Sequence, residues 1–86
     1  MTTTETAQAM QFQCGYNDTV YGLTEPNAFP VEIWPTARDW AIHIRELTLN
    51  LIIAETGNTD YVNGSLSCCL EFLRHGSVVR LQRDCT

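Results

Sequence analysis

Two adjacent cysteines, Cys68 and Cys69, are the residues of this chain whose types and spacing first suggest chemistry. Vicinal thiols can hold a metal ion or form a redox pair. A zinc site usually shows Cys-x₂-Cys spacing with further cysteines or histidines at similar spacing. The remaining candidates are scattered along the chain: Cys14, Cys85, His43 and His75. We therefore expect no metal site and no other cofactor.

Packing gives these cysteines a simpler role. We expect them in a strand, where adjacent side chains point to opposite faces of the sheet. Cys68 then belongs to the core as a small hydrophobic residue, and Cys69 to the outer surface. A disulfide between Cys68 and Cys85 is an alternative, because Cys85 lies diagonally across from Cys68 in the expected hairpin. The redox state of the four cysteines is left open.

A second group of polar residues shares one side of an expected helix: Asp39, His43, Glu46 and Asn50. Two carboxylates and an imidazole could bind a metal or carry out acid–base chemistry. The same pattern is the solvated side of any amphipathic helix, and the H-E-x-x-H motif is absent. The chain also lacks a G-x-S-x-G motif and a glycine-rich phosphate loop. We therefore expect no catalytic residues and no enzyme.

Composition limits the remaining functions. A chain of 86 residues makes one domain, and its 44% apolar content is ordinary for a folded protein. The net charge of −5 argues against binding nucleic acid directly and is compatible with a basic partner. The N-terminus does not resemble a signal peptide, and the apolar run 51–54 is too short to span a bilayer. We expect a cytoplasmic protein without a membrane partner, with a disordered tail at 1–9 and a single domain at 10–86.

The N-terminal third predicts strands. Apolar residues alternate with polar or small ones over 10–16, the period of a half-buried strand. The Asn17-Asp18 pair favours a turn. Shorter strands are expected at 20–23 and 31–34, separated by a loop with two prolines.

The segment 37–56 is the expected central helix. Thr36 can cap its N-terminus, Asp39 can complete a capping box, and Gly57 is placed for a left-handed C-terminal cap. Trp40 can pack back on Trp34 or Pro35. The stretch Leu47–Ile53 also alternates perfectly, so a strand remains the alternative there.

A C-terminal β-meander completes the expected fold. Asn63-Gly64 suits a type I′ hairpin turn, and His75-Gly76 suits a second one. The second turn places Glu71 opposite Arg80 and sorts apolar from polar side chains on both strands. The fold class predicted is α+β, a small antiparallel sheet of N-terminal strands and C-terminal meander packed on one central helix.

Surplus apolar surface carries the functional expectation. The expected helix has apolar residues outside its core stripe, and such patches usually mark interaction sites. The partner-binding residues we expect are Ile42, Leu49, Ile52, Ile53, Asp39, Glu46, Cys69 and Glu71. We expect a small acidic protein-binding domain, such as a phage-type inhibitor that blocks a larger host protein of the nucleic-acid-binding or defence class. The alternatives are a homo-oligomeric structural or accessory protein, for example a homodimer, and, ranked after it, a thiol or metal-binding protein.

Overall fold

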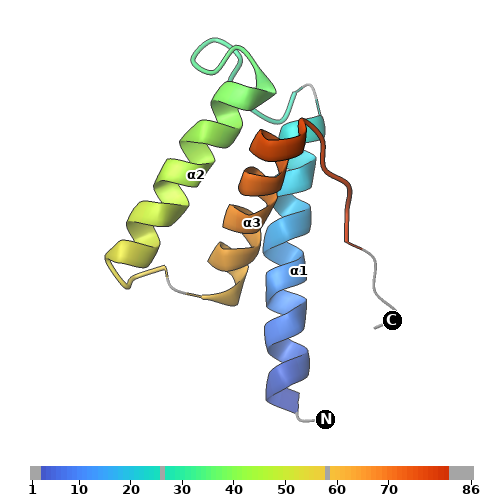
Figure 1. Cartoon of the computed structure of the whole chain (residues 1–86), viewed down its shortest axis with the longest axis vertical. Coiled ribbons are helices and arrows are strands. Elements are labelled where there is room, and N and C mark those ends of the chain that lie inside the picture. The colour runs from blue at the N-terminus through green and yellow to red at the C-terminus, as the bar shows by residue number, and fades with distance from the viewer. Residues whose placement is uncertain (1–2, 26, 58, 82–86) are drawn as a thin grey trace.

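Three helices build the domain. The computed structural model describes residues 3–25, 27–57 and 59–81, with side chains from residue 9 onward. Helix α1 spans Thr3–Thr24, α2 spans Ala37–Ile53 and α3 spans Asp60–His75. Helix α3 packs extensively against both other helices, whereas α1 and α2 barely touch (Figure 1). The described residues contain no β-strand, so the predicted α+β fold is wrong.

Helix α1 replaces the two predicted N-terminal strands. Its inward side carries Phe12, Tyr16, Val20 and Leu23, spaced by four, four and three residues as a helical stripe requires. Val20 and Leu23 are each only 4% exposed. The apolar residues that alternate over 10–16 therefore lie in a helix, where Phe12 and Tyr16 belong to the inward stripe and the predicted strand is wrong. Helix α1 starts at Thr3, ahead of the predicted domain boundary, and the expected disorder of 1–9 stays a prediction.

Helix α2 is the predicted central helix. The side-chain oxygen of Thr36 accepts a hydrogen bond from the backbone N–H of Asp39 at 3.1 Å, which confirms the N-terminal cap. The helix ends at Ile53, so the strand alternative for Leu47–Ile53 is wrong. The left-handed residue after it is Glu55, with φ 63°, and not Gly57.

Gly57 is needed for a different reason. It is buried against the side chain of Leu51, and a Cβ atom added to it would lie 2.5 Å from the Leu51 Cβ. Its backbone N–H also donates to the Leu51 carbonyl at 3.1 Å, which satisfies one of the free carbonyls of the last turn. Close approach, not backbone conformation, selects glycine here.

The segment before α2 forms a turn where a strand was predicted. The backbone N–H groups of Ile33 and Trp34 both donate to the Pro30 carbonyl, at 3.0 and 2.8 Å. The Trp34 ring then lies against Trp40 with centroids 6.5 Å apart, so the predicted contact between these rings is confirmed. The turn closes the N-terminal end of α2 with aromatic side chains.

Helix α3 replaces the predicted C-terminal meander. Thr59 caps its start, and Gly76 ends it with φ 82° in the left-handed region. Gly76 thus has the positive φ that the sequence predicts, but it terminates a helix and does not turn a hairpin. Glu71 pairs with His75, four residues later at 3.3 Å, and not with Arg80.

Two glycines set the distance between α1 and α3. A Cβ atom added to Gly15 would meet the Tyr61 carbonyl oxygen, and one added to Gly64 would meet the Phe12 carbonyl oxygen, both closer than 3.0 Å. The two helices therefore touch backbone to backbone. The predicted turn at Asn63-Gly64 is wrong, because Gly64 is a helical contact point.

Residues 77–81, which follow α3, return along α1 (Figure 1). The Leu81 backbone N–H donates to Asn17 Oδ1 at 2.7 Å, and Asn17 Nδ2 donates to the Leu81 carbonyl at 3.2 Å. The outer side of α2 and α3 is consequently left without this cover. Within 3–25, 27–57 and 59–81, none of the helices combines the length and apolar character of a membrane span.

The cap of α3 gives a direct test of the helical fold. Thr59→Ala removes the oxygen that accepts the Val62 N–H at 3.2 Å, and we expect it to lower the free energy of unfolding by about 1 kcal/mol. Urea denaturation followed by circular dichroism measures this. Thr56→Ala, at an exposed position between α2 and α3, is the matched control and should change stability by less than about 0.5 kcal/mol. Equal effects of the two substitutions would contradict the cap.

Candidate functional site

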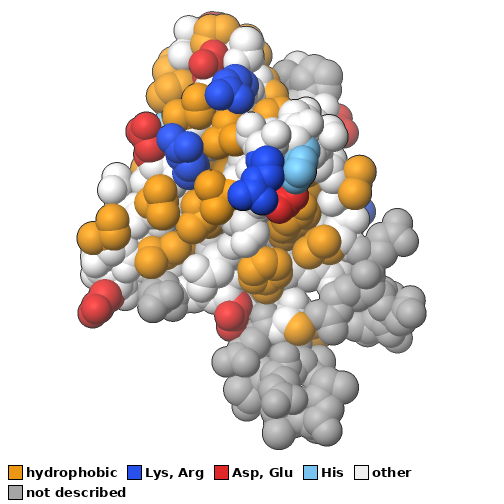
Figure 2. Space-filling view, viewed as in Figure 1, with side chains coloured by type: hydrophobic (Ala, Val, Ile, Leu, Met, Phe, Trp, Pro, Cys, Tyr) orange, Lys and Arg blue, Asp and Glu red, His pale blue; other side chains and the backbone are white. Residues whose placement is uncertain are grey.

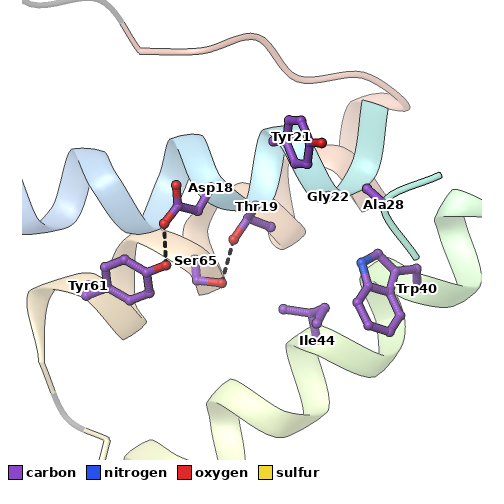
Figure 3. Close-up of a pocket in the computed structure, with 9 residues that line it drawn as sticks. All are labelled: Asp18, Thr19, Tyr21, Gly22, Ala28, Trp40, Ile44, Tyr61 and Ser65. Atoms are coloured by element: carbon purple, nitrogen blue, oxygen red, sulfur yellow. Dashed lines mark hydrogen bonds between the residues drawn. The ribbon is translucent and has the colours of Figure 1, made fainter. Parts of the chain in front are cut away.

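One pocket, of about 290 Å³, opens between α1 and α2 with α3 at its base (Figure 3). Its apolar end is formed by Ala28, Trp40 and Ile44. The pocket exists because α1 and α2 both pack on α3 but hardly contact each other. It can accommodate a small apolar group at that end.

The polar side chains of this pocket are hydrogen-bonded to one another. The Tyr61 hydroxyl donates to Asp18 Oδ2 at 2.5 Å, and the Thr19 and Ser65 hydroxyls are 2.6 Å apart (Figure 3). The hydrogen bond to Asp18, followed by burial, raises the pKa of Tyr61 to about 12. Both pairs join α1 to α3. These hydrogen bonds therefore stabilise the packing of the two helices. Neither pair includes a histidine that could act as a general base and activate a hydroxyl as a nucleophile.

The predicted polar side of α2 contains a histidine that is used for packing. The His43 ring stacks on Trp34 with centroids 4.3 Å apart and lies 5.5 Å from the Trp40 ring. Asp39 is engaged with the cap, where its Oδ2 accepts from the Thr36 hydroxyl at 2.9 Å. Asp39, His43, Glu46 and Asn50 share one side of the helix as predicted. The His43 imidazole, however, packs against aromatic rings, and Asp39 belongs to the helix cap.

Both adjacent cysteines are buried. Cys68 and Cys69 are each 0% exposed, so the expected core position of Cys68 is confirmed and the expected surface position of Cys69 is wrong. In a helix, adjacent side chains are about 100° apart, and both fit within the side of α3 that faces its two neighbours. Burial raises the pKa of each thiol to about 12.

This burial predicts a selective reaction with thiol reagents. Cys14 is free and exposed, whereas Cys68 and Cys69 are free and buried with raised pKa. Because the thiolate is the nucleophile, a brief treatment with iodoacetamide at neutral pH should modify Cys14 and leave Cys68 and Cys69 unmodified. Peptide mapping by mass spectrometry measures the modified fraction, and the urea-unfolded chain serves as the control. Rapid modification of Cys69 in the folded chain would contradict its burial.

Most of the predicted partner-binding residues of α2 lie on one exposed side of the helix, and Ile52 is the exception. Ile42, Leu49 and Ile53 are spaced by seven and four residues and lie on one side of the helix. Asp39 and Glu46 lie beside them. Ile52 is half-buried and faces nearer to α3. Leu49 is 39% exposed and Ile53 78% exposed, so both are available to a partner.

Helix α3 extends this surface. Leu66, Leu70 and Arg74 are spaced by four residues, on the side of α3 away from the buried Gly64 and Cys68. Leu70 is 48% exposed. Glu71, also predicted as a partner-binding residue, is exposed but turned toward His75.

Three arginines lie among these apolar residues. Arg38 and Arg45 are seven residues apart and flank Ile42 and Leu49 on the side toward α3. Arg45 is close enough to Cys69 of α3 that its positive charge lowers the thiol pKa, against the larger effect of burial. Arg74 contributes the third charge from α3.

Together these residues form what we call the docking surface: Arg38, Ile42, Arg45, Leu49, Ile53, Leu66, Leu70 and Arg74. Figure 2 shows hydrophobic side chains spread over this face, with basic side chains among them and acidic side chains close to the basic ones as well as at the rim. The pocket lies on the opposite flank of α2, where Trp40 and Ile44 point. The two features are therefore separate.

The arginines and the α3 residues of the docking surface were missed by sequence reasoning. The predicted hairpin assigned these α3 residues to strands of a sheet, so no second helix was expected beside α2. The seven-residue spacing of Arg38 and Arg45 was visible, but the position of α3 beside them was needed to make a surface.

Within the described ranges, no cluster of three or more histidine, cysteine, aspartate or glutamate side chains could hold a metal ion.

Comparison with protein family models, with curated proteins and with solved structures finds no match to this chain.

Proposed function

We propose that this chain is a non-enzymatic protein-binding domain that attaches to a larger protein through the docking surface and blocks it. The observation that carries the proposal is the exposure of Leu49 and Ile53 on α2 and of Leu70 on α3, two helices that pack against each other. Large apolar side chains gathered on an exposed surface are typical of interaction sites. The described part of the C-terminal segment, which ends at Leu81, lies against α1 and not on this surface.

The rest of the domain supports binding over catalysis. The Tyr61–Asp18 and Thr19–Ser65 pairs of the pocket are hydrogen-bonded, and His43 stacks on Trp34 with Trp40 nearby. A small domain that presents an apolar surface can inhibit a larger protein simply by covering part of it. An inhibitor of the phage type, directed at a host defence protein, is the form of this function that we propose.

The test compares two equally exposed positions. Ile53 on the docking surface and Val79 on the C-terminal segment are each 78% exposed. Three tagged chains are used to capture proteins from the native host at low salt: the wild type, Ile53→Gln and Val79→Gln. The captured partner is identified by mass spectrometry and then purified. We expect the purified partner to bind the wild type and Val79→Gln equally, and Ile53→Gln at least about tenfold more weakly.

Two outcomes would overturn this function. One is the absence of a stable partner at low salt. The other is equal binding by Ile53→Gln and Val79→Gln. Sedimentation velocity of the purified chain addresses the homodimer alternative, because self-association abolished by Ile53→Gln alone would assign the surface to a second copy of this chain.

A further inference from the structure

The pocket between α1 and α2 is polar at one end and apolar at the other. Figure 3 shows Asp18 and Tyr61 at one end, the Thr19–Ser65 pair in the middle and Trp40 at the other end. The pocket lies on the flank of α2 opposite the docking surface, so the proposed protein-binding function does not use it. The hydrogen atoms of its hydroxyl groups decide which ligand it can bind.

The hydroxyl protons of the polar end are already used within the protein. The Thr19 hydroxyl donates to the Gly15 carbonyl at 2.9 Å, so in the 2.6 Å contact between Thr19 and Ser65 the Ser65 hydroxyl is the donor. The Tyr61 hydroxyl donates to Asp18 Oδ2. Ser65 and Tyr61 therefore offer a ligand the lone pairs of their oxygen atoms and no proton.

Asp18 adds a negative charge to these acceptors. Among the described residues that line the pocket, it is the only charged one. Its Oδ2 accepts from Tyr61, which leaves Oδ1 to accept from a ligand. The Tyr21 hydroxyl, on a largely exposed side chain, can donate or accept and is neutral in this choice. The polar end therefore selects a ligand group that is positively charged and rich in donors.

The apolar end has room for one small ring. Ala28, Trp40 and Ile44 form it, and the volume of about 290 Å³ is at the lower limit for small-molecule sites. Asp18 and Gly22 are four residues apart on α1, which is about 6 Å along the helix axis. A ligand that reaches from the carboxylate to the apolar end thus needs a ring and a short linker.

We propose that this pocket binds a small free arylalkylamine, with its ammonium group at Asp18 and its ring against Trp40 and Ile44. An ammonium group has three donors and no acceptor, which matches an end formed by acceptors. A carboxylate or phosphate ligand would be repelled by Asp18, and the net charge of −5 attracts cations to the chain as a whole. The amine site is independent of the proposed protein-binding function.

The experiment compares three probes that share a phenyl ring: 2-phenylethylamine, 2-phenylethanol and phenylacetate. Binding to the full chain is followed by proton–nitrogen NMR at neutral pH. The chain has two tryptophans and therefore two indole N–H signals, which the variant Trp40→Phe assigns. We expect the amine to shift the Trp40 signal with a dissociation constant of about 1 mM or lower. The alcohol should bind about fivefold more weakly, and phenylacetate should cause no shift.

Variants at exposed carboxylates test the role of the charge. Asp18→Asn keeps an oxygen for the Tyr61 hydroxyl and removes the charge, so it should weaken the amine about fivefold and leave the alcohol within about twofold. Glu32→Gln makes the same change in the exposed turn before α2, outside the pocket lining, and should leave both probes within about twofold. Circular dichroism confirms that each variant keeps its helices.

A variant at Gly22 tests the position of the ring. Gly22 lines the pocket, and a Cβ atom added to it would lie 3.4 Å from Trp40 Nε1. Gly22→Ala should therefore narrow the apolar end and weaken the amine and the alcohol alike. Because alanine is favoured over glycine in a helix, this variant is expected to stay folded.

Several results would overturn the amine site. They are equal affinity for the amine and the alcohol, equal effects of Asp18→Asn and Glu32→Gln, and full binding by Gly22→Ala. A Trp40 signal that no probe shifts at about 10 mM, well above the expected dissociation constant, also counts against it. A lysine with both backbone ends blocked is the last probe. If it binds more tightly than 2-phenylethylamine, the pocket receives a lysine side chain of another protein and not a free amine.

Discussion

Gly64→Ala is expected to lower the free energy of unfolding by at least about 2 kcal/mol, because the added methyl group overpacks the contact between two helices. The new Cβ would overlap the carbonyl oxygen of Phe12 on α1, an atom held by the helix backbone that cannot rotate away. The two helices must separate to admit it. Separation loosens the core contacts of Val20 and Cys68 as well. Gly15→Ala should act in the same way against the Tyr61 carbonyl.

A third glycine provides the matched control. Gly22 lies in the same helix as Gly15, but a Cβ added there would meet only the Trp40 Nε1 atom, at 3.4 Å. Alanine is favoured over glycine in a helix by about 1 kcal/mol, so Gly22→Ala should be neutral or stabilising. Urea denaturation of the three variants measures the differences. If Gly64→Ala is as stable as Gly22→Ala, α1 and α3 do not cross at these residues.

The second large effect is a loss of stability at alkaline pH. Burial raises the pKa of the Cys68 and Cys69 thiols from 9.0 to about 12 in the folded chain. A raised pKa means that the folded state holds these protons more tightly than the unfolded state does. The stability from this difference is therefore complete below pH 9 and is lost as the pH rises from 9 to about 12.

The size of this loss follows from the shift. Each pKa unit corresponds to about 1.4 kcal/mol, so one thiol alone can remove roughly 4 kcal/mol, which is comparable to the whole stability of a small domain. Tyr61, with its pKa raised to about 12, and Tyr16, with its pKa raised mainly by burial, add to the loss above pH 10. We expect unfolding, followed by circular dichroism, between pH 9 and 12.

Cysteine variants separate the thiols from the tyrosines. The double variant Cys68→Ala and Cys69→Ala should be less stable than the wild type at pH 7, because alanine leaves space in the core. Its stability should nevertheless fall less between pH 9 and 11 than that of the wild type. Cys14→Ala, at an exposed thiol, is the control and should show the full alkaline loss. The explanation fails if the double variant and the wild type lose equal stability over this range.

The local signals of helix ends were readable in the sequence. Thr36 and Asp39 identified the start of α2, and the positive φ expected at Gly76 is present. The same positive φ serves a hairpin turn and the end of a helix equally well. The sequence could therefore locate Gly76 as a special position without deciding which element it ends.

The interpretation of α3 failed for a related reason. The alternation of leucines, cysteines and serines fits the period of a strand. The same stretch also fits a helical stripe, formed by Ser65, Cys68, Cys69 and Phe72. Thr59 as a cap and Asp60 in the first turn were the signals that favoured the helix. The paired turn signals at Asn63-Gly64 and His75-Gly76 outweighed them, although the first is a contact between helices.

The sequence by itself determined the position of α2 and its cap and the apolar surplus of Ile42, Leu49 and Ile53. It also placed Cys68 in the core, but through a strand that the structure replaces with α3. Only the tertiary structure decided the use of Gly15 and Gly64, the burial of Cys69 and the gathering of arginines on the docking surface. The physical reason is that caps and stripes act over a few residues, whereas a backbone crossing or a shared surface depends on which helices pack together.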